Sequence, residues 1–182
     1  MAKVYQLKVS LRGVKPPVWR RILVEDTMTF MQLQKTVDIA FGWPLSKFSA
    51  FKVRGITVCQ RHSHIDVLKE CLNSITTRLF VFNLEPGDRI EMKQDIVDKW
   101  TFDVKVEAYM APDMKTAYPI CVDAMGITPP KELGSPREYA QLLQALSDEN
   151  HESHAFYKFE YSNFEKENTL TIKKINHRMI AL

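Results

Sequence analysis

The sequence predicts an α+β domain with a β-grasp-like opening, in which a hairpin and a helix precede a mixed or antiparallel sheet with flanking helices. Three observations predict it. Apolar and polar residues alternate over 5–11 and again over 100–106, as in strands that bury one face. A helical repeat follows a capping motif that begins at Thr29. The other strand-like segments form a block, with helical segments between and after them.

The composition is that of an ordinary folded protein. The 182 residues suit one domain over 1–182. Lys and Arg number 25 against 22 Asp and Glu, and the resulting charge of +3 does not by itself indicate nucleic acid. With 45% hydrophobic residues, 6 glycines and 3 cysteines, the chain does not fit a collagen-like, disordered, disulfide-framework or membrane-spanning protein. No signal peptide is visible and cysteines are few, so we expect a reduced, cytoplasmic protein.

The first forty residues are predicted to form the hairpin and the helix. Strand-like runs over 5–11 and 18–24 flank a turn that holds one glycine and two prolines. A capping-box pair, Thr29 and Gln32, then starts a helix. Gly42 ends it, because glycine readily adopts the backbone conformation that terminates a helix. A hairpin followed by a helix opens the β-grasp fold, which carries no function by itself.

The middle of the chain is predicted to contain three further strands and a helix. Residues 48–58 fit one strand, and 63–75 fit a helix because their apolar residues recur every three or four positions. The turn residues Glu-Pro-Gly-Asp at 85–88 join two strand-like runs, 78–83 and 89–93, as a hairpin.

After the strand at 100–106, the chain is predicted to become helical. Residues 110–134 hold four prolines, too many for regular structure, and are predicted to form a proline-rich loop. Ser135 then caps a helix, with proline next and glutamate three positions later. A last helix is predicted at 170–179, so the C-terminal part, 135–182, is helical.

One run contains residue types that bind zinc. Cys59, His62, His64 and Cys71 form a Cys-x2-His-x-His-x6-Cys pattern. The alternative is a connection with incidental histidines, because structural zinc sites usually pair two short knuckles and this run supplies half of one. Cys71 also lies on the apolar side of the predicted helix, where a thiol fills space. We therefore expect no metal and no other cofactor.

Two other clusters resemble catalytic motifs but lack the required arrangement. His151 and His154 are three residues apart, whereas a zincin helix needs four. Asp88, Glu91 and Lys93 resemble the acid-acid-lysine set of metal-dependent nucleases, but they lie in one hairpin arm, where surface charge pairing explains them. The chain contains no nucleophile elbow, P-loop or dinucleotide fingerprint. The sequence therefore indicates no catalytic residue.

Arg20 and Arg21 carry the sharpest hypothesis about a site. Alternation along 18–24 directs them to opposite faces, and their apolar neighbours predict that at least one guanidinium is partly buried. A buried guanidinium requires a partner, preferably a carboxylate that accepts two hydrogen bonds. Asp98 is in phase with the inward residues of the strand that follows it and is the first choice of partner. Asp95 is the second.

These residues define a candidate ligand-binding cleft with two interpretations. In the functional one, the arginines meet an anionic ligand and the tryptophans stack. In the structural one, the same residues form an ion pair beneath two core tryptophans. The candidate residues are Trp19, Arg20, Arg21, Asp95, Asp98 and Trp100.

Six basic residues precede the first acid, Glu25, and such a run could meet the phosphates of nucleic acid. Because strand alternation separates Arg20 from Arg21, a solvated strand edge is the simpler explanation. The partner is therefore open between an anionic ligand and nucleic acid, and no membrane partner is expected.

Several motifs, taken together, are similar to those of one family. Residues 15–22, Lys-Pro-Pro-Val-Trp-Arg-Arg-Ile, preceded by Tyr-Gln-Leu-Lys-Val at 5–9, resemble the opening of the plasmid pRiA4b ORF-3-like family, whose members are often called transposon passenger proteins. The resemblance runs nearly end to end, and weaker motifs follow in the family's order. They are Ala40-Phe41-Gly42-Trp43, Asp95-Ile96-Val97-Asp98-Lys99-Trp100, Tyr118-Pro119-x-Cys121, Pro129-Pro130-Lys131-Glu132, Ser135-Pro136-x-x-Tyr139 and Ile175-Asn176-x-Arg178.

The resemblance implies a single α+β domain and no established activity. It also reveals departures: typical members carry His-x-His where this chain has Lys47 and Ser49, and a His where it has Phe102. Two family cysteines are replaced by Thr128 and Leu133. Because phenylalanine can neither transfer a proton nor bind zinc, these departures argue against catalysis in this chain.

We therefore expect an uncharacterised plasmid ORF-3-like protein that acts as a non-catalytic binding or interaction module. One alternative is a nucleic-acid-binding protein of mobile-element context, which predicts one contiguous positive face. Another is a hydrolase-type enzyme using acidic residues, which predicts a pocket holding groups with perturbed pKa values. A protein-interaction domain predicts an exposed apolar patch or a free strand edge instead.

Overall fold

The computed structural model describes residues 2–60, 71–94, 100–161, 163 and 170–180. The strands are β1 (Val4–Leu11), β2 (Trp19–Glu25), β3 (Ser49–Val53), β4 (Ile56–Cys59), β5 (Leu72–Asn73), β6 (Arg89–Gln94), β7 (Thr101–Met110) and β8 (Ile120–Met125). The helices are α1 (Phe30–Phe41), α2 (Pro136–Ser147), α3 (His154–Glu160) and α5 (Ile172–Met179), with short 3-10 helices η2 (Leu79–Phe82) and η3 (Lys131–Leu133).

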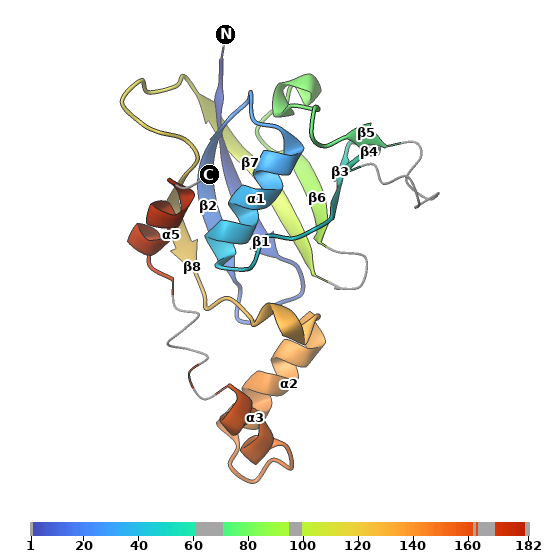
Figure 1. Cartoon of the computed structure of the whole chain (residues 1–182), viewed down its shortest axis with the longest axis vertical. Helices are drawn as coiled ribbons and strands as arrows, with labels where there is room; N and C mark the ends of the chain where they lie inside the picture. Colours follow the sequence, from blue (N-terminus) through green and yellow to red (C-terminus); the bar gives the residue numbers. More distant parts are fainter. Residues whose placement is uncertain (1, 61–70, 95–99, 162, 164–169, 181–182) are drawn as a thin grey trace.

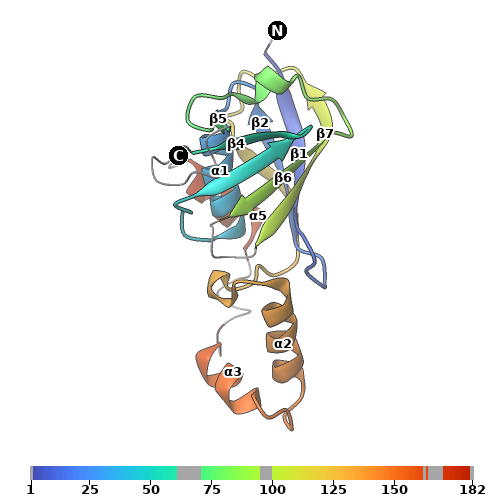
Figure 2. The ribbon, with the colours of Figure 1, turned by 90° about the vertical axis from the view of Figure 1, so that its right-hand side faces the viewer.

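The sheet is mixed and mostly antiparallel, as predicted. Its eight described strands lie in the order β5-β4-β3-β6-β7-β1-β2-β8, and within that set β4 and β5 are the parallel pair. Helix α1 crosses one face of the sheet, with α5 beside it against β8 (Figure 1). Helices α2 and α3 project from one end as an arm (Figure 2). The α+β class and the hairpin-then-helix opening are confirmed.

Helix α1 begins and ends where the sequence predicts. Thr29 Oγ1 accepts a hydrogen bond from the Gln32 main-chain N–H at 3.2 Å, and Gln32 Oε1 accepts one from the Thr29 N–H at 2.9 Å, which completes the capping box. Gly42 ends the helix at a φ of 71°, a left-handed conformation that costs glycine little. The buried stripe of the helix lies against the sheet and comprises Phe30, Leu33, Val37, Ala40 and Phe41.

The single strand predicted at 48–58 is wrong, because the chain turns back within it. Arg54 and Gly55 have φ values of 46° and 84°, the pair of positive angles that the common two-residue hairpin turn requires. Strands β3 and β4 pair on either side of that turn. Gly55 is the signal for the turn in the sequence, and an otherwise strand-like run conceals it.

The strand predicted at 78–83 is also wrong. The main-chain N–H groups of Leu79 and Phe80 each donate at 2.9 Å, to the carbonyls of Met28 and Asp26 respectively. This docks the segment on the turn before α1, and the chain winds there into η2. Strand β6, its predicted hairpin partner, lies instead between β3 and β7. A tertiary docking contact therefore overrides a strand-like pattern.

The helix predicted at 63–75 falls outside the described residues up to residue 70, and its described end is wrong because β5 occupies it. The parallel pairing of β5 with β4 brings Cys71 beside Cys59, with their Cα atoms 5.8 Å apart, and the two form a disulfide. The expectation of reduced cysteines is therefore wrong for this pair. Cys121 is free and buried.

The loop predicted at 110–134 is wrong in its middle, where β8 forms an edge of the described sheet. Pro119 directly precedes β8, and edge strands tolerate a proline there. Asn176 of α5 covers the open edge: its Oδ1 accepts from the Cys121 N–H at 2.7 Å, and its Nδ2 donates to the Cys121 carbonyl at 2.9 Å. A side-chain amide thus takes the place that a further strand would occupy.

The two predicted C-terminal helices are confirmed and a third is new. Helix α2 is capped by Ser135, whose Oγ accepts from the Glu138 N–H at 3.3 Å. The helix predicted at 170–179 corresponds to α5. Helix α3 was not predicted, and it begins where His154 Nδ1 lies 2.8 Å from the Ala145 carbonyl oxygen of α2. That contact ties the two helices of the arm together.

Candidate functional site

Arg20 lies on the inner face of β2 and is 1% exposed, so the prediction of a buried guanidinium is confirmed. All five of its N–H groups have acceptors, at 2.8–3.4 Å. Its Cζ also lies 5.0 Å from the centre of the Phe41 ring. The acceptors are the main-chain oxygens of Trp19, Ala40, Met125 and Gly126 and the hydroxyl of Thr128.

Neutral oxygens accept from every N–H group of Arg20, and no carboxylate among the described residues does so. Asp95 and Asp98, the proposed partners, lie outside the described residues, so the pairing with a carboxylate stays a prediction. Burial lowers the pKa of Arg20 to about 10, which leaves it charged at neutral pH. The hydrogen bonds of Arg20 thus connect α1, β2 and the chain after β8, and their role is structural.

Arg21 lies on the opposite face, as alternation predicts. Its Nε donates to Glu107 at 2.6 Å, and Nη1 pairs with Asp123. The hydrogen bond from Arg21 is the main reason why the pKa of the Glu107 carboxyl lies below its usual value. The Trp19 ring lies under both Arg21 and Lys8, 5.1 Å and 4.6 Å from its centre. The outer face is therefore a network of paired charges.

Trp100 is fully buried and belongs to the core. Its Nε1 donates to the Lys131 carbonyl at 3.0 Å, and its ring lies 5.4 Å from that of Trp43. The structure thus brings Trp19 and Arg21 together on the outer face and places Arg20 and Trp100 on the inner side. The described members of the predicted cleft do not face a common space.

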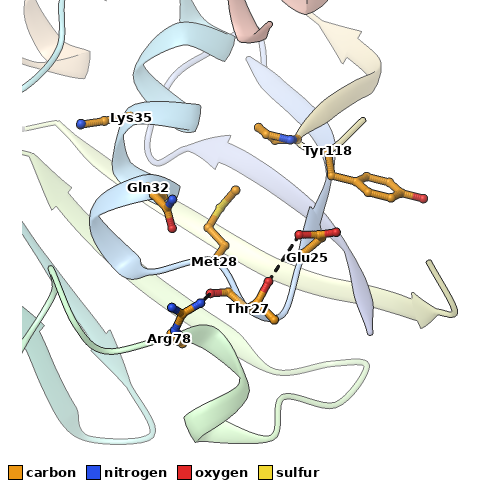
Figure 3. Close-up of a pocket in the computed structure, with 8 residues that line it drawn as sticks. Glu25, Thr27, Met28, Gln32, Lys35, Arg78 and Tyr118 are labelled. Carbon is orange, nitrogen blue, oxygen red and sulfur yellow. Dashed lines mark hydrogen bonds between the residues drawn. The ribbon is translucent and has the colours of Figure 1, made fainter. Parts of the chain in front are cut away.

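A pocket of about 320 Å³ opens near the other end of β2 from Arg20, between the start of α1, the start of η2 and the chain that enters β8 (Figure 3). We call it the α1 pocket. Its lining residues are Glu25, Thr27, Met28, Gln32, Lys35, Arg78, Tyr118 and Pro119.

Two cationic side chains define the chemistry of the α1 pocket. Lys35 comes from α1, and Arg78 comes from the residue before η2 (Figure 3). Arg78 Nη1 donates to the Thr27 carbonyl at 2.7 Å, which fixes the guanidinium at the pocket wall. The Tyr118 ring points away from both cations and its hydroxyl accepts from the Asp113 N–H at 3.2 Å. No motif links positions 35 and 78, so sequence reasoning missed this pair.

A buried polar cluster lies under the end of α1. Asp38 is 0% exposed and accepts hydrogen bonds from the Ser46 N–H at 2.8 Å, from the Ser46 hydroxyl at 3.0 Å and from the Gln94 amide. Burial raises its pKa to about 6, although these hydrogen bonds and the charge of Lys131 oppose the rise. Gln94 Oε1 and Ser49 Oγ, on paired residues of β6 and β3, have no hydrogen-bond partner in the part of the chain that the structure describes. The residues of this Asp38 cluster do not line the α1 pocket, nor do they line a second pocket that lies beside Asp26.

The other predicted clusters give no metal site. Cys59 and Cys71 are joined as a disulfide, while His62 and His64 lie outside the described residues. In the described ranges, no three His, Cys, Asp or Glu side chains are grouped to hold a metal ion. The charge pairing expected at β6 is present, with Glu91 3.5 Å from Lys93. Among the described helices, none has the length and apolar character needed to cross a membrane.

Comparison with known proteins agrees with the motifs. The family described as "Plasmid pRiA4b ORF-3-like protein" matches residues 3–170. The uncharacterized protein y4hQ of Sinorhizobium fredii (strain NBRC 101917 / NGR234) is 29% identical over 161 residues, which cover 85% of this chain and 79% of that one. The crystal structure of MM3350, a protein of unknown function from Methanosarcina mazei Go1, superposes with a TM-score of 0.82 at 21% identity, over 95% of this chain and 97% of that one. The chain therefore belongs to the plasmid pRiA4b ORF-3-like family.

Proposed function

We propose that this protein is a non-catalytic binding module that takes a small ligand carrying an anionic group in the α1 pocket. One observation carries the proposal. Lys35 and Arg78 both line the pocket, and within the described part of the chain neither has a carboxylate partner. Paired hydrogen bonds from a guanidinium suit a carboxylate or a phosphate, and an ammonium adds a point charge.

The contrast with other arginines supports this assignment. Arg12 pairs with Glu91 and Asp103, and Arg54 pairs with Asp88 at 2.5 Å. Arg21, on the outer face, pairs with Glu107 in the same way. A volume of about 320 Å³ also suits a small molecule, at the lower end of typical ligand sites.

The two alternatives find less support. A nucleic-acid module needs a contiguous positive face, but Arg12 and Arg21 on the outer face are neutralised by carboxylates. An enzyme needs a perturbed acid in a pocket, and Asp38, whose pKa is raised, lies outside both pockets discussed here. The interaction role stays a prediction: on the arm, Phe156 and Phe159 are 61% and 81% exposed, as interface aromatics often are.

The test is a titration with two simple anions, sodium hexanoate and inorganic phosphate, followed by amide NMR shifts. We expect saturable shifts confined to the residues around Thr27, Lys35 and Arg78. Lys35→Gln and Arg78→Gln should each weaken binding about two- to fivefold, because each exposed charge contributes modestly. Together they should weaken it by about the product of the two single effects.

Matched controls come from the arm. Lys158→Gln and Arg137→Gln remove the same kinds of charge from exposed positions far from the pocket (Figure 1). They should leave the titration unchanged. Equal weakening in the control and pocket variants would show attraction by net charge alone and would refute the α1 pocket as the site.

A further inference from the structure

A second pocket lies on the far side of the turn that follows β2. It has a volume of about 480 Å³ and shares Thr27 with the α1 pocket. We call it the Asp26 pocket. Its lining residues are Ala2, Lys3, Tyr5, Asp26, Thr27, Phe80 and Asn83.

Asp26 is buried at the wall of this pocket with part of its carboxylate unpaired. The residue is 7% exposed, and among the described residues its buried Oδ1 has no hydrogen-bond partner. Its main chain is fixed on both sides, because its N–H donates to the Lys3 carbonyl at 2.8 Å and its carbonyl accepts from the Phe80 N–H at 2.9 Å. A buried acceptor without a donor is costly, so a carboxylate with incomplete hydrogen bonds at a pocket wall indicates a missing donor.

Lys3, the cationic residue that lines this pocket, does not supply that donor. Lys3 Nζ is 3.8 Å from Glu85, 3.4 Å from Asn83 Oδ1 and 4.4 Å from the centre of the Tyr109 ring. These contacts engage the ammonium away from Asp26. Burial raises the pKa of Tyr5, and the negative charge of Asp26 adds to that rise, so Asp26 makes this pocket electronegative.

From this geometry we infer that the Asp26 pocket binds a small ligand through an alkylammonium group. The ammonium supplies N–H donors to the Asp26 carboxylate at the pocket wall and a charge that a buried carboxylate favours. Phe80 is half exposed at the rim, where an aromatic ring can contact the alkyl chain or the cation. The inference is independent of the α1 pocket, because other residues and the opposite charge carry it.

The experiment titrates the full chain with three probes and follows amide NMR shifts. n-Butylammonium chloride carries charge and N–H donors, tetramethylammonium carries charge alone, and butan-1-ol carries neither charge nor N–H. We expect saturable shifts near Thr27, Phe80 and Asn83 with butylammonium, and about tenfold weaker binding of the other two probes.

The variants separate the buried carboxylate from general attraction. Asp26→Asn keeps the shape and should weaken butylammonium binding about tenfold. Glu149→Gln removes an exposed carboxylate that lines neither pocket and should leave binding unchanged. Should Asp26→Asn fail to fold, Phe80→Ala serves in its place, because a half-exposed side chain can be truncated safely, and it should also weaken binding.

Three results would overturn the inference. Equal binding of tetramethylammonium would show that no N–H donor is recognised. Equal binding to wild type and to Asp26→Asn, or to wild type and to Phe80→Ala, would place the probe elsewhere. Butylammonium binding that appears only in Lys3→Gln would show that Lys3 occupies the site in solution.

Discussion

Arg20 and Asp26 lie six positions apart in sequence around one strand, and both are buried charged residues, but their surroundings differ. Every N–H group of Arg20 has an acceptor. Asp26 keeps an unpaired carboxylate oxygen at the wall of a pocket. Burial alone therefore does not mark a site: a buried charge whose hydrogen bonds are complete holds the fold together, whereas an incomplete one beside open space is available to a ligand.

The same distinction separates the cationic side chains. The arginines of the outer face pair with carboxylates, so their charge is neutralised within the protein. Lys35 and Arg78 line the α1 pocket, and among the described residues neither has a carboxylate partner. The outer face of the sheet thus carries paired charges, whereas the α1 pocket carries two cations without such a partner.

The largest expected effect tests the complete hydrogen bonding of Arg20. Arg20→Met should lower the free energy of unfolding by about 3–5 kcal/mol, because it leaves several buried carbonyl oxygens without donors. Arg20→Lys should recover little, since an ammonium has three donors for sites that use five. Urea unfolding measures both. A loss below about 1 kcal/mol for Arg20→Met would contradict a structural role.

An intermediate effect concerns the Asp38 cluster, where hydrogen bonds only partly offset burial. Its folded-state pKa of about 6 exceeds the ordinary 3.8, so its contribution to stability is complete below pH 4 and is lost as pH rises through 6. Relative to Asp38→Asn, the wild type should lose up to about 3 kcal/mol between pH 4 and pH 7. Urea unfolding across that range measures the difference.

The wild type must be compared with Asp38→Asn, because other carboxylates also change the stability over this pH range. Arg12 lowers the pKa values of Glu91 and Asp103 through hydrogen bonds. Such carboxylates increase the free energy of unfolding as pH rises over part of the same range. Both proteins share that gain, so it cancels. A difference that stays constant from pH 4 to pH 7 would show that Asp38 titrates normally.

The smallest effect sharpens the contrast between neighbours. Arg21→Met removes the partly exposed partner of Glu107 and should cost about 1 kcal/mol or less, with the cost shrinking at high salt. It uses the same substitution one residue from Arg20. If Arg20→Met and Arg21→Met lower the free energy of unfolding by the same amount, the distinction between complete burial and surface pairing fails.

Local patterns in the sequence predicted much of the secondary structure. The two alternating strands, the capping box at Thr29 and the cap at Ser135 are where they were expected, because each depends on residues within one turn or one strand. The opposite directions of Arg20 and Arg21 follow from the two-residue repeat of a strand. The family motifs were also readable, and the match over residues 3–170 confirms them.

Only the tertiary structure decided which of these elements meet. Docking on the turn before α1 changes 78–83 from a strand into η2, and the β4–β5 pairing joins Cys59 to Cys71. Most N–H groups of Arg20 donate to main-chain carbonyl oxygens, which every residue carries, so no sequence pattern reveals these acceptors. Both pockets likewise combine residues from distant segments. Sequence patterns report short-range periodicity, whereas hydrogen-bond completion and empty space depend on long-range packing, and that is why the fold class was predictable and the sites were not.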